Sequence, residues 1–80
     1  MSEYKLKDNT RVDCLTDEYA VEVDFAKKWA EAVGQSLHYA EMTGKKPAIV
    51  LIAGKSDSRH LDRLMKVAKK YQIKVWVVEK

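Results

Sequence analysis

The chain has 80 residues, which leaves room for a single domain with one small hydrophobic core. With 46% hydrophobic and 34% charged residues it can fold, and this excludes an intrinsically disordered chain. The 15 Lys and Arg outnumber the 12 Asp and Glu, so the net charge is +3. One cysteine, Cys14, and two histidines exclude an internal disulfide and a Cys/His zinc site.

The small net charge is the sum of two unlike parts of the chain. Residues 1–53 carry 7 basic and 9 acidic side chains, whereas residues 54–80 carry 8 basic and 3 acidic ones. A basic half beside an acidic half is compatible with a polyanion partner and a metal site. No apolar run approaches the ~18 residues of a membrane span, and residues 1–5 contain no apolar signal core. We therefore expect a cytoplasmic protein with no membrane partner.

The first part of the chain predicts a β-hairpin. A short strand is compatible with residues 4–6, and residues 11–15 and 20–25 alternate in polarity on either side of a polar connection at 16–18. In the second strand Val21, Val23 and Phe25 face one way, and Glu22 and Asp24 face the other.

From residue 26 the hydrophobic period becomes helical and ends at Gly44. The aliphatic run 48–53 predicts a buried parallel strand, 58–71 a second helix with Ser56 or Ser58 as N-cap, and 73–78 a last strand. The expected buried faces of the two helices are Ala26, Trp29, Ala30, Val33, Leu37 and Ala40, then Leu61, Leu64, Met65, Ala68 and Tyr71. The order β-β-α-β-α-β predicts an α/β domain over residues 1–80, a mixed β-sheet flanked by two helices.

Carboxylates stand where strands seldom carry them. Asp13 lies mid-strand and Glu22 and Asp24 lie on the neighbouring strand, although strand interiors are depleted in Asp. Hairpin pairing can bring Asp13 beside Glu22, and like charges this close repel unless a cation neutralises them. Oxygen ligands without Cys or His suit Mg²⁺ or Mn²⁺. The alternative is an exposed sheet face with ordinary solvated acids.

The helix that follows carries a polar stripe of Lys28, Glu31 and Gln35. Lys28 lies four residues after Asp24, where a lysine can orient an attacking water and stabilise charge on a phosphate. The alternative is an intrahelical ion pair between Lys28 and Glu31.

On the second helix, basic residues recur at three- or four-residue spacing from Arg59 and Arg63 to Lys66 and Lys70. This row is either a solvated face or, at Arg59 and Arg63, a contact with nucleic-acid phosphates.

These residues resemble the core of the PD-(D/E)xK nuclease superfamily, which includes restriction endonucleases and Holliday-junction resolvases. The resemblance covers roughly residues 10–78 and rests on Asp13, Glu22-Val23-Asp24, Lys28 and Gln35-Ser36-Leu37-His38-Tyr39. It implies a restriction-endonuclease-like core and hydrolysis of DNA phosphodiester bonds with Mg²⁺ or Mn²⁺.

By position, the resemblance implies that Asp13 and Glu22 are metal ligands, with the Val23 carbonyl as a possible third and Asp24 as an added one. Lys28 and Gln35 complete the implied catalytic set. Asp24 stands where the usual motif has lysine, so the lysine has either migrated to Lys28 or is absent. The N-terminal helix of the superfamily is absent or vestigial, and Glu3 is a weak candidate for its remnant. An inactive nuclease-fold module for DNA binding or assembly is the alternative. For so short a chain we also expect a homodimer.

Overall fold

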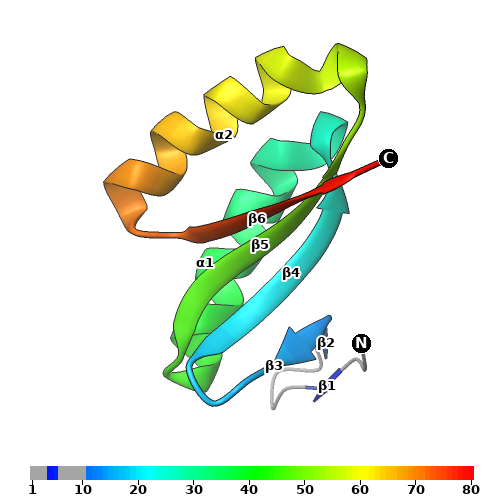
Figure 1. The fold of residues 1–80 in the computed structure, drawn as a ribbon. Coiled ribbons are helices and arrows are strands. Elements are labelled where there is room, and N and C mark those ends of the chain that lie inside the picture. The colour runs from blue at the N-terminus through cyan, green and yellow to red at the C-terminus, as the bar shows by residue number, and fades with distance from the viewer. Residues whose placement is uncertain (1–3, 6–10) are drawn as a thin grey trace.

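The structure, a computed structural model, describes residues 4–5 and 11–80 and gives side-chain surroundings from Val12 onward (Figure 1). The early strands are β1 (Tyr4–Lys5), β2 (Arg11–Val12) and β3 (Cys14–Leu15). The main body follows as β4 (Tyr19–Phe25), η1 (Ala26–Lys28), α1 (Trp29–Thr43), β5 (Lys46–Ala53), η2 (Lys55–Asp57), α2 (Ser58–Tyr71) and β6 (Lys74–Glu79).

The main sheet has four strands in the order β3-β4-β5-β6. β3 is antiparallel to β4, and β4, β5 and β6 are parallel, joined by α1 and α2. The predicted mixed sheet and two crossover helices are therefore confirmed. The hairpin is present, but the prediction of one strand over residues 11–15 with Asp13 mid-strand is wrong, because the chain bends at Asp13 and residues 11–12 pair with β1 rather than β4. β1 and β2 form a separate antiparallel ribbon. The described residues before Asp13 are thus strands, while Glu3 and Leu6 lie outside the described residues.

Both helices lie on one face of the sheet, which we call the covered face. The two crossovers advance in the same direction, from β4 to β5 to β6, so right-handed connections place both helices on the same side. The core confirms this, because Ile49, Leu51 and Ala53 of β5 pack with Leu64 and Ala68 of α2 and with Ala32 of α1.

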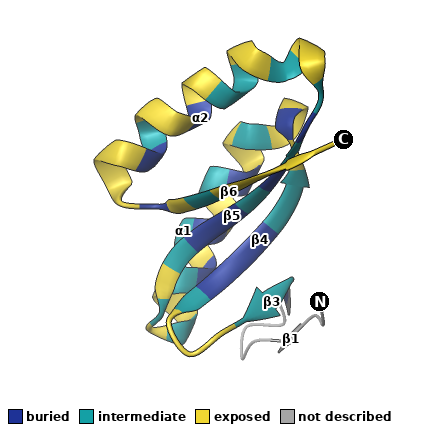
Figure 2. Cartoon of the chain, viewed as in Figure 1, coloured by how far each residue is buried: buried dark blue, intermediate teal, exposed yellow. Residues whose placement is uncertain are grey.

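The opposite side, which we call the open face, has no helix packed on it in the described part of the chain. Strand alternation and register assign to it Tyr19, Val21, Val23 and Phe25 of β4, Lys46, Ala48, Val50 and Ile52 of β5, and Lys74, Trp76 and Val78 of β6. Phe25, Trp76 and Val78 are 46%, 41% and 49% exposed. Figure 2 shows that β6 is exposed along most of its length.

The first helix begins later and is turned differently from the prediction. Residues 26–28 form a 3₁₀ turn, and α1 starts at Trp29. Its most buried residues are Ala32, Ser36 and Tyr39, whereas Ala30 is exposed. Tyr39 packs against Ala20 of β4, which rotates the buried stripe toward that strand. The predicted stop at Gly44 is confirmed: this residue has φ 70° and its N–H bonds to the Ala40 carbonyl.

The second helix buries Leu64 and Ala68 as predicted, but Met65 and Tyr71 are 47% and 51% exposed. The expectation for those two residues is wrong because α2 packs on α1 and covers little of β6. Its N-cap is Asp57, not Ser56 or Ser58. Neither of the described helices is long and apolar enough to cross a membrane.

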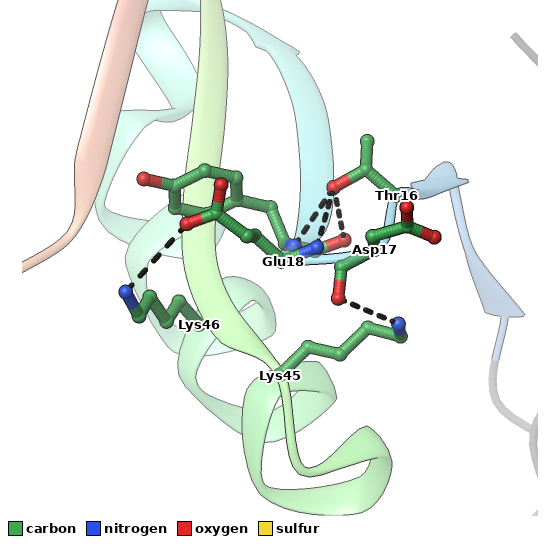
Figure 3. Close-up of polar contacts among 6 residues, drawn as sticks. Thr16, Asp17, Glu18, Lys45 and Lys46 are labelled. Carbon is green, nitrogen blue, oxygen red and sulfur yellow. Dashed lines mark hydrogen bonds and ion pairs between the residues drawn. The ribbon is translucent and has the colours of Figure 1, made fainter.

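The hairpin turn is tied to the start of β5 (Figure 3). Thr16 Oγ1 accepts the N–H groups of Glu18 and Tyr19 at 3.2 and 2.8 Å. Lys45 Nζ donates to the Asp17 carbonyl at 3.2 Å, and Lys46 Nζ lies 3.6 Å from a Glu18 carboxylate oxygen. These contacts fix the β3–β4 register, and that register decides where Asp13 lies.

Candidate functional site

The hairpin brings together two carboxyl groups, those of Asp13 and Glu22. Cys14 pairs with Val21 and Leu15 with Ala20, so the same register places Asp13, at the bend between β2 and β3, opposite Glu22. The Val23 N–H donates to Asp13 Oδ2 at 2.8 Å. The Asp13 and Glu22 carboxyl groups are themselves hydrogen-bonded. The predicted approach of Asp13 to Glu22 is confirmed.

Glu22 lies on the covered face and is only 5% exposed. The pKa of its carboxyl is raised to about 9, first by burial and then by the hydrogen bond to Asp13 and the charges of Asp13 and Asp24. At neutral pH Glu22 therefore keeps its proton and donates it to Asp13. The alternative of an ordinary solvated acid does not hold for this residue.

Asp24 is half-buried and uses Oδ1 to accept the Phe25 N–H at 2.9 Å. Within residues 4–5 and 11–80 no group of three or more His, Cys, Asp or Glu side chains is placed to hold a metal ion. The assembled part of the predicted metal set is therefore the Asp13–Glu22 pair, and the role of Asp24 as an added ligand stays a prediction.

The predicted polar stripe is present and faces solvent. Lys28, Glu31 and Gln35 are all exposed, and Lys28 is the N-cap residue of α1 rather than part of its first turn. Among the described residues the Lys28 side chain forms no ion pair, so the alternative of a Lys28–Glu31 bridge is not seen. Within residues 4–5 and 11–80 no ion pair or hydrogen bond joins the Lys28 ammonium to the carboxyl pair.

Arg59 and Arg63 are exposed on α2, as are Lys66 and Lys70. They come from a different element from the carboxyl pair, and no contact links the two within the described part of the chain. Their role as phosphate contacts stays a prediction.

Sequence reasoning missed two features. One is a pocket of about 280 Å³ at the carboxyl ends of the parallel strands, lined by Phe25, Ala26, Lys27, Ile52, Asp57 and Lys80. Its position follows the general rule that open parallel sheets bind ligands beyond those strand ends, so the element order could have indicated it. The other feature is the exposure of Phe25 at the end of β4 and of Trp76 and Val78 on β6, which the alternating pattern alone could not show.

None of the three comparisons with known proteins, against family models, curated proteins and solved structures, gives a match for this chain. The carboxyl pair and its surroundings must therefore carry the functional argument.

Proposed function

We propose that this chain is a metal-dependent nuclease that hydrolyses DNA phosphodiester bonds, as a minimal member of the PD-(D/E)xK superfamily. The observation that carries the proposal is the Asp13–Glu22 pair, in which two acidic side chains from adjacent strands are held in contact on the covered face. A protein gains no stability from burying two acids together, so the arrangement favours a functional role.

The pair fits a divalent cation. Two carboxyl groups that share a proton can exchange that proton for an ion, and an oxygen-only donor set suits Mg²⁺ or Mn²⁺. Asp13 and Glu22 would hold the ion, with the Val23 carbonyl as a third donor. When bound, the ion supplies a water of lowered pKa and neutralises charge on the phosphate.

The residues beyond the pair have separate roles in the proposal. The Lys28 ammonium orients the attacking water and donates to a phosphate oxygen. Gln35 contacts the substrate or its water network. Asp24 occupies the usual lysine position, where it can add a ligand or hold Lys28 by charge attraction.

DNA binding would rely on the basic C-terminal part of the chain, with Arg59 and Arg63 contacting phosphates in a salt-dependent manner. A homodimer would widen the footprint of an 80-residue domain to that of a duplex.

The cleavage test uses a panel of labelled DNA substrates with Mn²⁺ or Mg²⁺. We expect Asp13→Asn, Glu22→Gln and Lys28→Ala to abolish cleavage while the circular dichroism spectrum is unchanged. Glu41→Gln and Lys69→Ala are the matched controls, because both residues are exposed and lie away from the pair. Wild-type cleavage in all three site variants contradicts the proposal.

The second candidate is an inactive nuclease-fold module. It is favoured because, among the described residues, no ion pair or hydrogen bond joins Lys28 to the carboxyl pair, and two rather than three acids are assembled. Calorimetric titration with Mn²⁺ separates the two, because ion binding at the pair must release the Glu22 proton and so tighten as the pH rises. If the titration shows no Mn²⁺ binding at millimolar concentration, the result favours the inactive module.

A further inference from the structure

The two faces of the sheet carry charges of opposite sign. Among the described strand residues, the acids Asp13, Glu22, Asp24 and Glu79 all lie on or beside the covered face. The charged positions of the open face are Lys46 and Lys74, and Lys80 reaches it from the chain end. Lys46 is paired with the Glu18 carboxylate at 3.6 Å, so the lysines on this face that carry no acidic partner among the described residues are Lys74 and Lys80. An apolar face with an excess of lysines is complementary to an anion that also presents apolar surface.

The open face also carries three aromatic rings. Tyr19 and Trp76 meet edge to face across β5, with centroids 5.7 Å apart. Ala48, on the same face of β5, is fully buried. Trp76 has Lys74 Nζ 5.7 Å from its ring centroid, and Phe25 has Lys80 Nζ at the same distance. Phe25 and Trp76 stay 46% and 41% exposed. Each exposed ring is thus paired with an ammonium group that can contact a phosphate while the ring stacks on a base.

The two pairs stand apart on the face. Phe25 aligns with Ile52 and Val78, one strand period beyond the row that holds Trp76. With ~3.3 Å per residue and ~4.8 Å between strands, the backbone positions of Phe25 and Trp76 lie roughly 12 Å apart, and the Trp76 ring lies toward Tyr19, at the other end of β4 from Phe25. A flexible chain of several nucleotides can reach both rings, whereas a mononucleotide cannot.

A pocket adjoins the Phe25 end of this face. Phe25 and Ile52 form its apolar wall, and Lys27 and Lys80 stand at its rim. The acid that lines it, Asp57, accepts the Gly54 N–H at 2.7 Å and is therefore engaged within the chain. The pocket volume of about 280 Å³ accommodates a planar base against the Phe25 ring.

A second copy of this chain fits the face poorly. Two open faces packed on each other would bury Lys74 and Lys80 of both copies without an acidic partner on that face, and such desolvated charges are costly. A duplex fits poorly too, because its bases are stacked on each other and cannot stack on protein rings.

We infer that the open face binds single-stranded nucleic acid, with bases stacked on Trp76 and Phe25 and phosphates held by Lys74, Lys80 and Lys27. This goes beyond the proposed hydrolysis, because it uses the opposite face of the sheet and needs no metal ion.

The test is fluorescence anisotropy of a labelled 15-nucleotide oligo(dT) against the full chain in EDTA, which prevents cleavage. We expect oligo(dT) to bind and the affinity to fall as the salt concentration rises. A duplex of matched sequence and a poly-glutamate peptide should compete poorly with oligo(dT). Trp76→Ala and Phe25→Ala should each weaken binding about tenfold. Lys74→Gln and Lys80→Gln should each lower the slope of log K against log salt by about 0.7.

The matched control is Tyr71→Ala. Tyr71 is another exposed aromatic residue with a lysine, Lys70, 5.7 Å from its ring centroid, but it lies on α2. It should bind like the wild type. Trp76→Ala removes a large side chain from the open face and could unfold the domain. Trp76→Phe is therefore added as a variant that keeps an aromatic ring for stacking. Binding of oligo(dT) should quench the fluorescence of Trp76 in the wild type, and Trp76→Phe should lose that quenching.

Several outcomes overturn the inference. The first is an oligo(dT) affinity that is unchanged in both Phe25→Ala and Trp76→Ala. The second is competition by poly-glutamate or duplex DNA that is as strong as competition by unlabelled oligo(dT). The third is a dimer, detected by sedimentation, that dissociates in Phe25→Ala and Trp76→Phe. Loss of cleavage in Asp13→Asn with oligo(dT) binding intact leaves the inference standing, so the two proposals fail separately.

Discussion

The covered and open faces of the sheet are made by alternate residues of the same three strands, yet they have opposite characters. On the covered face the helices bury Ile49 and Leu51 together with an acid, Glu22. On the open face the apolar side chains of Phe25 and Val78 meet solvent. Along β4, Ala20 and Val21 are buried as expected, whereas the buried Glu22 and the exposed Phe25 are the reverse of what simple burial would give.

This difference between the two faces indicates which residues have a functional role. A buried Glu beside an Asp, and exposed aromatic rings beside lysines, both run against the free-energy preference of a small domain. Two such departures on one sheet suggest two separate tasks, one for each face. The predictions that follow test that separation, from the largest expected effect to the smallest.

The largest expected difference between the two faces is in the free energy of unfolding lost when an apolar side chain is truncated to alanine. Leu51→Ala removes a fully buried side chain from the covered face and should lower the free energy of unfolding by ~2–5 kcal/mol. Val78→Ala, on the open face and 49% exposed, should cost ~1 kcal/mol or less. Urea denaturation measures both. Equal losses mean that the open face is covered by something in solution, and the contrast between the faces then fails.

The buried acid gives the covered face a pH signature. The pKa of Glu22 is raised from 4.5 to about 9, so between these pH values the unfolded chain has lost a proton that the folded chain keeps. The metal-free protein should therefore lose stability as pH rises from about 4.5 to about 9, and gain none back above it. Glu22→Gln should remove this slope and be more stable than the wild type at pH 8.

Thermal unfolding at pH 5, 7 and 9 in EDTA checks this prediction. Glu41→Gln, an exposed acid on α1, is the control and should keep the wild-type slope. A wild-type curve that rises between pH 5 and 9 more steeply than that of Glu22→Gln contradicts the assignment of a protonated Glu22.

Asp57 lies between the two faces, because it precedes the first residue of α2, which covers one face, and lines the pocket beside the other. Asp57→Ala removes the acceptor of the Gly54 N–H and should cost ~1 kcal/mol in urea unfolding. Asp57→Asn keeps an acceptor and should cost less, while removal of the negative charge should tighten oligo(dT) binding. If Asp57→Asn leaves oligo(dT) binding unchanged, the pocket is not part of the binding surface.

The smallest effect is expected at the Lys46–Glu18 ion pair, whose side chains are 70% and 66% exposed. Glu18→Gln should change the free energy of unfolding by less than ~1 kcal/mol. It should also free Lys46 and tighten oligo(dT) binding slightly at low salt. The same variant in high salt provides the control, since screening should remove the difference.

Much of the fold follows from local sequence signals. Alternation in residues 20–25, the polar turn 16–18, Gly44 at the helix end and the aliphatic run 48–53 each depend on near neighbours, and all of them are confirmed. The pairing of Asp13 with Glu22 was also predictable, because a short turn fixes the hairpin register. The N-cap at Asp57 and the rotation of α1 were not, because they depend on packing.

The sequence by itself determined the strands and helices, the hairpin register and hence the meeting of two acids. Only the tertiary structure decided which face of β4 each of its alternating sets would occupy. The reason is physical. Alternation separates residues onto two sides of a strand but does not say which side the crossover helices will cover. Two right-handed crossovers advancing the same way put α1 and α2 over Glu22 and left Phe25 and Trp76 in solvent.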